Sequence, residues 1–368
     1  MADIRFCKRC VMNNASDRTI IFDENGFCNY CSKALSEIDT RTYFPNETGK
    51  RKLDDLIKKI KSENADKKYD CMMGISGGLD SAYLAFLGYK WGLRILAVHI
   101  DDGFDTEISK SNIQKLCEAA NIKLRTIKPD PVQYNDLTLS YIKAGVPDIA
   151  VPQDNILFAF LYDVAKREKI RYFLSGGNFA LESILQRDYN IDAYDTVNIK
   201  AIHKRFGNEK IDKLKLISRE KKFIYDKLGI VQSERPLNFI DYNRDRAFKE
   251  LYDFCGFEYY GSKHLENMLT AFLQLCWMPQ KFGVDKRSSH LSSMIVSGQM
   301  TREEAFDELR KPIYNQDLMD EYIDVICDKL KITRDELEYW MIEPNHEHTD
   351  YKYDKFFAMC RNVKKYLK

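Results

Sequence analysis

The fold of this chain is decided by one stretch of sequence, Ser76-Gly77-Gly78-Leu79-Asp80-Ser81. It follows an apolar stretch, 69–75, that predicts a short strand, and it precedes a helical pattern over 82–91. Glycine lets the backbone approach a ligand closely, and the N–H groups at the start of a helix point outward. A strand, a glycine-rich turn and a helix start therefore predict an anion-binding site, to which the two serines add hydroxyl donors.

Asp80 is the unusual member of this stretch, because a carboxylate beside a phosphate would repel it. A cation between them removes the conflict, since Mg2+ is usually held by one or two carboxylates together with phosphate oxygens. The stretch lacks the lysine and the spacing of a Walker A loop. It resembles instead the S-G-G-x-D-S loop of the PP-loop ATP pyrophosphatases. That resemblance implies an enzyme that cuts ATP between the α and β phosphates and forms an adenylated intermediate.

The bulk composition excludes several classes of protein. A chain of 368 residues is long enough for about two domains. Its net charge of +1 gives no basic excess for nucleic acid, and no apolar run is long enough to span a bilayer. The first residues lack the apolar region of a signal sequence. We therefore expect a cytoplasmic protein with no nucleic-acid partner and no membrane span.

Four of the ten cysteines are clustered near the N-terminus. They are Cys7, Cys10, Cys28 and Cys31, two C-x2-C pairs separated by seventeen residues. This spacing predicts a four-thiolate zinc site, and four protein ligands leave no open position, so the zinc would be structural. An iron–sulfur cluster uses the same ligands and is the main alternative, and a disulfide pair would need an oxidising compartment. The remaining cysteines lie in mostly apolar contexts and are expected to be small buried residues.

The middle of the chain alternates strand and helix patterns. Strands are expected at 69–75, 93–100, 122–127 and 170–174, with helical patterns such as 107–120 and 155–168 between them. This alternation predicts an α/β fold with a parallel sheet, whose ligands lie beyond the carboxyl ends of the strands. We expect a four-cysteine zinc-binding module over 1–45, a PP-loop ATP pyrophosphatase domain over 46–240, and a mostly helical substrate-binding or partner domain over 241–368.

Two further strand ends carry candidate nucleotide contacts. The second strand runs into His99-Ile100-Asp101-Asp102-Gly103, where PP-loop enzymes hold adenine and ribose largely through main-chain groups. For the side chains, an exposed acidic turn is an equal alternative, although Asp101 would also suit a metal. The fourth strand runs into Ser175-Gly176-Gly177-Asn178, a second glycine turn before a helix. Asn178 is expected to cap that helix and to contact the ligand.

The segment 259–290 is dense in polar groups. Lys281, Lys286 and Arg287 would make an anion clamp, since arginine binds phosphate or carboxylate through two parallel hydrogen bonds. On spacing alone, a solvated charged face explains these residues as well.

Four pieces occur in one order along the chain: the paired C-x2-C, S-G-G-L-D-S, L-S-G-G-N-F-A-x-E-S and K-F-G-x-D-K-R-x-x-H. Together they resemble the N-acetyl sugar amidotransferases of bacterial surface-polysaccharide synthesis. The implied ATP-binding residues are Gly74, Ser76, Gly77, Gly78, Asp80, Ser81, His99, Asp101, Gly103, Gly176, Gly177 and Asn178. The implied substrate-binding residues are Glu182, Lys263, Lys281, Asp285, Lys286 and Arg287. The implied catalytic residues are Asp80, Ser81, Lys286, His264 and His290.

The resemblance implies an ATP-dependent amidotransferase that turns the acetamido group of a nucleotide-linked N-acetyl sugar into an acetamidino group. The amide oxygen would attack the α-phosphorus, and ammonia would displace AMP from the adenylyl imidate. No cysteine lies at residue 2 or in a glutaminase-like elbow, so a separate glutaminase with a cyclase-like companion is expected to deliver ammonia. Both a UDP-linked diacetamido uronic acid and a CMP-linked nonulosonic acid remain open as substrates.

Two other functions compete with this interpretation. A tRNA thiolation enzyme of the same superfamily would share the cysteine knuckles and the loop, although near-neutral charge disfavours tRNA binding. A non-enzymatic zinc scaffold with a degenerate nucleotide site is disfavoured by the intact Asp80 and both serines.

Overall fold

A five-stranded parallel sheet forms the centre of the protein. The computed structural model describes residues 4–189, 191–261 and 265–355. The strands are β1 Cys71–Gly74, β2 Ile95–Ile100, β3 Lys123–Ile127, β4 Tyr172–Leu174 and β5 Gln232–Glu234, in the order β3-β2-β1-β4-β5. The predicted fold class is confirmed. β5 was not expected, because its sequence Gln-Ser-Glu is short, polar and at the edge of the sheet.

The strand order reverses between β1 and β4. From β1 the chain proceeds to β2 and β3 on one side, and it crosses back to β4 and β5 on the other. In β1 and β4, Met72 pairs with Phe173 and Met73 with Leu174. The glycine turns that follow these two strands therefore meet at the switch point, where open parallel sheets bind ligands.

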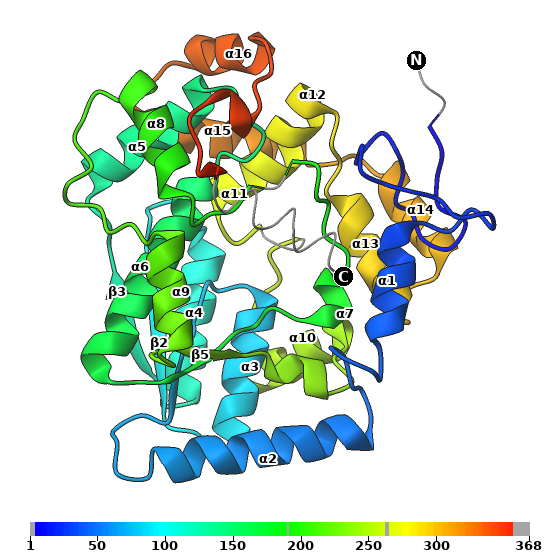
Figure 1. Cartoon of the computed structure of the whole chain (residues 1–368), viewed down its shortest axis with the longest axis vertical. Coiled ribbons are helices and arrows are strands. Elements are labelled where there is room, and N and C mark those ends of the chain that lie inside the picture. The colour runs from blue at the N-terminus through cyan, green and yellow to red at the C-terminus, as the bar shows by residue number, and fades with distance from the viewer. Residues whose placement is uncertain (1–3, 190, 262–264, 356–368) are drawn as a thin grey trace.

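Helices surround the sheet and continue to the end of the described chain. In Figure 1, α2 lies at one end of the molecule, and α5, α8, α15 and α16 gather at the other. The helices are α1 Asn29–Glu37, α2 Glu47–Glu63, α3 Leu79–Lys90, α4 Glu107–Ala119, α5 Pro131–Lys143, α6 Val151–Glu168, α7 Phe179–Glu182, α8 Thr196–Phe206, α9 Arg219–Lys227, α10 Arg244–Cys255, α11 Met268–Phe272, α12 Met278–Phe282, α13 Arg287–Val296, α14 Arg302–Arg310, α15 Gln316–Leu330 and α16 Arg334–Ile342. Three short elements complete the set: the 3-10 helices η1 Pro236–Phe239 and η3 His348–Asp350, and the π-turn η2 Leu273–Trp277.

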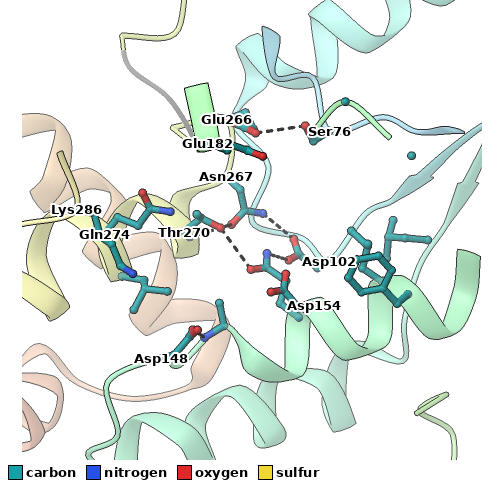
Figure 2. Close-up of a pocket in the computed structure, with 18 of the residues that line it drawn as sticks. Ser76, Asp102, Asp148, Asp154, Glu182, Glu266, Asn267, Thr270, Gln274 and Lys286 are labelled. Atoms are coloured by element: carbon teal, nitrogen blue, oxygen red, sulfur yellow. Dashed lines mark hydrogen bonds between the residues drawn. The ribbon is translucent and has the colours of Figure 1, made fainter. Parts of the chain in front are cut away.

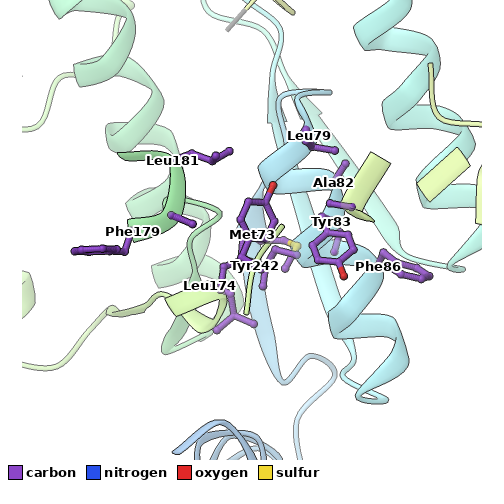
Figure 3. Close-up of a cluster of buried hydrophobic side chains, with 14 of the residues drawn as sticks. Met73, Leu79, Ala82, Tyr83, Phe86, Leu174, Phe179, Leu181 and Tyr242 are labelled. Atoms are coloured by element: carbon purple, nitrogen blue, oxygen red, sulfur yellow. The ribbon is translucent and has the colours of Figure 1, made fainter. Parts of the chain in front are cut away.

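Apolar packing at the switch point holds the anion loop. Figure 3 shows the side chains of α3 between the sheet and the segment that carries Tyr242. Leu79, Tyr83 and Phe86 are all buried and recur at helical spacing on one face of α3. Met73 in β1 is buried in the same cluster. The loop therefore stands between a rigid strand and a firmly packed helix.

The cysteine module packs against the C-terminal half of the chain rather than standing alone. In Figure 1, α1 lies beside α13 and α14. The guanidinium of Arg302 in α14 donates to the backbone carbonyls of Cys7, at 2.8 Å, and Cys10, at 3.2 Å. The N–H of Val11 donates to the hydroxyl of Ser292 in α13. The cysteine module and helices α13 and α14 thus share one folded body.

The helical C-terminal region agrees with its sequence pattern in most places. Thr333 and Glu336 form a capping box at the start of α16. α11 begins at Met268, where Asn267 caps it, and it continues as the π-turn η2. In the described residues, no helix combines the length and apolarity required to cross a membrane.

Several helices were absent from the sequence interpretation, among them α5 and α13. α5 begins after Asp130 and Pro131, and this cap followed by proline is a helix-start signal that would have located it. α13 contains four serines and reads as a polar loop. Its serine hydroxyls are satisfied within the helix, as where Ser293 donates to the carbonyl of Ser289 at 2.9 Å.

Candidate active site

A cavity of about 610 Å³ opens at the carboxyl ends of β1, β2 and β4. Gly74 at the end of β1, Ser76 just after it, His99 in β2 and Gly176 after β4 line it. The start of α6 and residues between Glu266 and His290 form the opposite wall. The predicted nucleotide turns and part of the polar segment near the C-terminus therefore face one enclosed space.

The backbone of the SGGLDS loop is shaped by its two glycines. Gly77 has a φ of +79°, and a Cβ there would lie 2.5 Å from the carbonyl oxygen of Ser109. The loop is braced from inside, since the N–H of Gly78 donates to the Ser76 hydroxyl at 3.2 Å. The Ser76 and Ser81 hydroxyls lie 3.4 Å apart. Both serines therefore lie at the start of α3, as the anion-site prediction requires.

The segment after α10 contacts this loop through two residues that sequence reasoning missed. The Tyr260 hydroxyl accepts a hydrogen bond from the N–H of Leu79 at 2.7 Å. A carboxylate oxygen of Glu266 accepts one from the Ser76 hydroxyl at 3.2 Å. Glu266 thus places a carboxylate beside the loop, which is the ligand chemistry of Mg2+, whereas Asp80 accepts from Tyr242 and is not among the residues that line the cavity.

The second glycine turn touches the first. A Cβ on Gly176 would lie 2.9 Å from the backbone nitrogen of Ser81, so only glycine allows this approach. Asn178 caps α7 as predicted, accepting from the N–H of Leu181 at 3.0 Å, and its amide donates to the carbonyl of Gly176. Gly177 follows in the same turn, against Glu182.

His99 occupies a fixed position under the loop. Its Nδ1 lies 2.9 Å from the carbonyl oxygen of Ile75, and its Nε2 lies 3.0 Å from a carboxylate oxygen of Asp105. Both neighbours are acceptors, so a ring that donates to both carries a positive charge. Burial alone would lower the pKa of His99, but the hydrogen bond and charge of Asp105 outweigh it and raise the pKa.

The structure corrects the acidic turn after β2. Asp101 pairs with Lys128 at 2.9 Å and accepts from the N–H of Gly103, and neither Asp101 nor Gly103 is among the residues that line the cavity. The neighbouring Asp102 lines it instead. Successive side chains of a strand point to opposite faces, so the sequence could have predicted which aspartate faces the cavity only if the last residue of β2 had been known.

Asp102 is the centre of a hydrogen-bond network on the cavity wall (Figure 2). It accepts from the side chains of Gln153 at 2.6 Å, Tyr134 at 3.0 Å and Asn267 at 3.1 Å. Burial and the nearby charge of Asp105 raise its pKa. Because α6, α5 and the cap of α11 all bond to one carboxylate, this wall is rigid.

Among the charged side chains that line the cavity, carboxylates outnumber cations. The carboxylates are Asp102, Asp105, Asp148, Asp154, Glu182 and Glu266. The cations among the lining residues are Lys286 and Arg287, beside the histidines His99 and His290. The interior therefore has an acidic character that favours a cationic reactant or a metal ion beside any anionic substrate.

The predicted anion clamp is divided by the structure. Lys281 is buried, and its ammonium donates to the carbonyls of Trp340 at 2.9 Å and Glu343 at 2.6 Å at the end of α16. Arg287 lines the cavity, but its guanidinium is engaged by Asp285 and by carbonyls at the end of α14. Lys281, Asp285 and Arg287 thus have their polar groups committed to the fold, which corrects their assignment to substrate.

Other residues of the predicted site keep their place at the cavity. Lys286, Glu182 and His290 line it, and Nδ1 of His290 lies 3.2 Å from the carbonyl oxygen of Leu181. Lys263 and His264 lie outside the described residues.

The four clustered cysteines form a compact donor set. Their sulfurs all lie within 4.8 Å of one another, with Cys7 and Cys31 at 3.7 Å and Cys10 and Cys28 at 3.5 Å. A tetrahedral zinc with bonds of about 2.3 Å separates its sulfurs by about 3.8 Å. Backbone N–H groups point at the sulfurs, as from Arg9 to Cys7. The set fits one metal ion.

Comparisons with known proteins find similarity in a C-terminal segment and over most of the chain. Residues 266–364 match the family model described as LPS biosynthesis protein WbpG-like, C-terminal domain. The chain is 20% identical over 317 residues to the uncharacterized protein MJ1599 of Methanocaldococcus jannaschii, covering 86% of this chain and 96% of that protein. It is 26% identical over 144 residues to a probable mitochondrial tRNA-specific 2-thiouridylase 1 of Caenorhabditis elegans, 35% of this chain and 38% of that protein.

Two solved structures are similar at low identity. NMN synthetase from Francisella tularensis is 15% identical with a TM-score of 0.37, covering 82% of this chain and 100% of that chain. The U34-tRNA thiolase NcsA from Methanococcus maripaludis, with its [4Fe-4S] cluster, is 14% identical with a TM-score of 0.35 and covers 89% of each chain. The sheet topology itself gives the protein a parallel α/β fold, and residues 266–364 are similar to the C-terminal domain of an LPS biosynthesis family.

Proposed function

We propose that this protein is an ATP-dependent amidotransferase that converts the acetamido group of a nucleotide-linked N-acetyl sugar into an acetamidino group, in bacterial surface-polysaccharide synthesis. One observation carries the proposal. The region similar to the LPS biosynthesis family supplies one wall of the cavity, including Glu266, Asn267 and Lys286, and the glycine turns supply the other. A nucleotide site and a polysaccharide-related region thus share one enclosed space.

The chemistry needs ATP because an acetamido carbonyl is a poor electrophile and its oxygen is a poor leaving group. The amide oxygen attacks the α-phosphorus, pyrophosphate leaves, and an O-adenylyl imidate forms. Ammonia then forms the new C–N bond as AMP departs with the original oxygen. The protein contributes mainly positioning and electrostatics, as in phosphoryl transfer generally.

The residues of the two turns divide this work. Ser76, Gly77 and Gly78 would bind the pyrophosphate through N–H and hydroxyl groups, with Ser81 at the same helix start. Asp80 and Glu266 would hold Mg2+, which offsets charge on the departing pyrophosphate. Gly176 would bring the second turn against the α-phosphate.

Two proposals concern groups outside the reaction itself. The four-cysteine set would hold structural zinc, because its sulfur separations suit a single ion, whereas a four-iron cluster binds each thiolate through a different iron. Ammonia would come from a separate glutaminase with a cyclase-like companion. The chain as a whole would act in the cytoplasm on a nucleotide sugar made there.

A tRNA thiolation enzyme is the second candidate, since the thiouridylase similarity points to it. That chemistry commonly uses cysteine thiols near the adenylate. Among the described residues that line the cavity, none is a cysteine. This difference favours the amidotransferase.

The proposal is tested by AMP release from the purified protein with Mg-ATP and ammonium. The panel contains a UDP-linked diacetamido uronic acid, a CMP-linked N-acetylated nonulosonic acid and bulk tRNA. AMP formed with one sugar nucleotide, together with a sugar product in which an imino group replaces the amide oxygen by mass spectrometry, supports the proposal. AMP formed only with tRNA overturns it.

A further inference from the structure

The part of the cavity away from the SGGLDS loop has a polar floor, which we define as Gln186, Asp148, Asp154 and Lys286. Asp148 precedes α6 and Asp154 lies in its first turn, Lys286 precedes α13, and Gln186 follows α7. Figure 2 shows Asp154 beside Asp102, with Asp148 and Lys286 further from Ser76. Three segments distant in sequence therefore meet at this floor.

Gln186 indicates that a polar ligand belongs here. Its side chain is 2% exposed, and its amide nitrogen is held by the carbonyls of Ser16 at 3.1 Å and Asp285 at 3.4 Å. Those bonds fix the amide, and its buried oxygen accepts no hydrogen bond within the described part of the chain. A buried acceptor without a donor is costly, so a ligand N–H or O–H is expected to reach it.

Asp154 is the carboxylate of the cavity without a fixed partner. Asp102 accepts several hydrogen bonds, Asp105 is bound to His99, and Asp148 accepts from the N–H of Ala150 at 3.1 Å. No hydrogen bond or ion pair to the Asp154 carboxylate occurs in residues 4–189, 191–261 and 265–355. Its side chain is exposed to the space of the cavity, and protein atoms surround that part of the cavity.

The groups around Asp154 disfavour its negative charge. Asp148 faces it from the segment before α6, Asp102 lies beside it, and the phenols of Tyr134 on α5 and Tyr194 before α8 are further titratable neighbours. The positive charge of Lys286 interacts with the carboxylate of Asp148. Burial and the charge of Asp148 raise the pKa of Asp154 to about 7.

We infer that Asp154 is the general base of the ammonia step, accepting a proton from the attacking nitrogen while the other three residues of the polar floor hold the acetamido end of the sugar. This inference rests on the proposed function. As the nitrogen lone pair forms the C–N bond, one N–H proton passes to the Asp154 carboxylate. The C–O bond to AMP breaks, AMP leaves with that electron pair and the oxygen, and Asp154 returns its proton to water. The acidic lining concentrates ammonium at the same place.

The test separates adenylation from the ammonia step in the full-length protein. Sugar-dependent exchange of labelled pyrophosphate into ATP reports adenylation, and acetamidine formation with ammonium reports the second step. Asp154→Asn is expected to keep the exchange rate within about threefold and to lower acetamidine formation about 100-fold or more at pH 7. When rates are compared at equal concentrations of free ammonia, the wild-type ammonia step should lose its rate below about pH 7, and Asp154→Asn should lack that limb. Asp66→Asn, an exposed aspartate outside the cavity lining, is the matched control.

The outcomes distinguish a wrong role for Asp154 from a wrong proposed function. If Asp154→Asn lowers exchange and acetamidine formation equally, Asp154 serves binding or folding, and the inference is overturned. An unchanged ammonia step in this variant also overturns it, and leaves the proposed function standing. If neither the UDP-linked nor the CMP-linked sugar elicits exchange in the wild type while tRNA does, the proposed function fails, and the inference fails with it.

Discussion

The Tyr242 hydroxyl donates a hydrogen bond of 2.5 Å to a carboxylate oxygen of Asp80. Tyr242 is 1% exposed and follows β5 and η1, whereas Asp80 is in the first turn of α3. The bond therefore joins the edge of the sheet to the anion loop. Burial and the charge of Asp80 raise the pKa of Tyr242 well above its ordinary value, so the phenol stays a donor at neutral pH.

Replacing Tyr242 by Phe tests whether this bond positions Asp80 for magnesium. The variant keeps the ring packing and loses one hydrogen bond to a charged group, worth about 1.5–3 kcal/mol. We expect Mg-ATP to bind about tenfold or more weakly by titration calorimetry. Tyr89→Phe, on the exposed side of the same helix, is the control and should bind normally. Equal affinities in both variants would contradict the role given to Tyr242.

Replacing Gly176 by Ala tests the contact between the two glycine turns. The added methyl would lie 2.9 Å from the backbone nitrogen of Ser81, and the backbone of a packed helix cannot yield cheaply. We expect a loss of about 1–3 kcal/mol in the free energy of unfolding, together with loss of ATP binding. Gly74→Ala meets only ordinary contacts of 3.7 Å or more and should fold normally. Denaturant unfolding measures the first effect and ATP titration the second. Normal ATP binding by Gly176→Ala would show that ATP binding does not need the close contact between the two turns.

The buried Lys281 and the half-buried Lys286, five residues apart, provide a matched pair. Lys281→Met removes three donors from the carbonyls at the end of α16, so the melting temperature should fall while Mg-ATP binding is unchanged. Lys286→Met removes a cation that lines the cavity, so the sugar nucleotide should bind about tenfold more weakly with little loss of stability. If Lys281→Met instead weakens binding of the sugar nucleotide and Lys286→Met lowers the melting temperature, the roles given to the two lysines are reversed.

The cysteine set predicts a metal stoichiometry. Elemental analysis should find one zinc per chain, and a strong chelator or Cys28→Ser should lower the melting temperature, because metal binding supplies folding energy to so small a module. Iron with visible absorbance in anaerobically purified protein would instead favour a cluster. Arg302→Ala should weaken docking of the module on α14 without reducing the metal content.

Asp154 predicts a specific dependence of stability on pH. Its folded pKa of about 7 lies above the value of an unfolded aspartate, so the folded state binds the extra proton between these values. Its contribution to stability is complete at low pH and is lost as the pH rises through about 7. Asp154→Asn should therefore melt at a higher temperature than the wild type at pH 8, and the difference should vanish near pH 4. The difference in melting temperature between Asp66→Asn and the wild type should not change with pH in this way.

The strand ends and the cysteine set could be predicted because each is specified locally. Gly77 and Gly176 are required by a positive φ or by a close backbone approach, and the paired C-x2-C spacing sets the metal ligands. Parallel strands then bring their carboxyl ends together without further information. The first four strands were located from apolar runs for the same reason.

The remaining site residues depend on contacts that the sequence does not record. Glu266 reaches Ser76 across 190 positions, and Tyr260 reaches Leu79 across 181. Lys281 and Lys286 look alike in a charged segment, yet one faces carbonyls and the other a cavity. Asp154 lies in an ordinary amphipathic helix and stands out only once the cavity is known.

The clamp of Arg302 on the carbonyls of Cys7 and Cys10 has a consequence for synthesis. The knuckle leaves the ribosome before its docking helix α14, which is made 295 residues later, about 15–60 s at ordinary translation rates. During that interval the surface that packs against α14 has no partner there. The module is thus made well before it can dock, and metal captured early would hold its shape in the meantime.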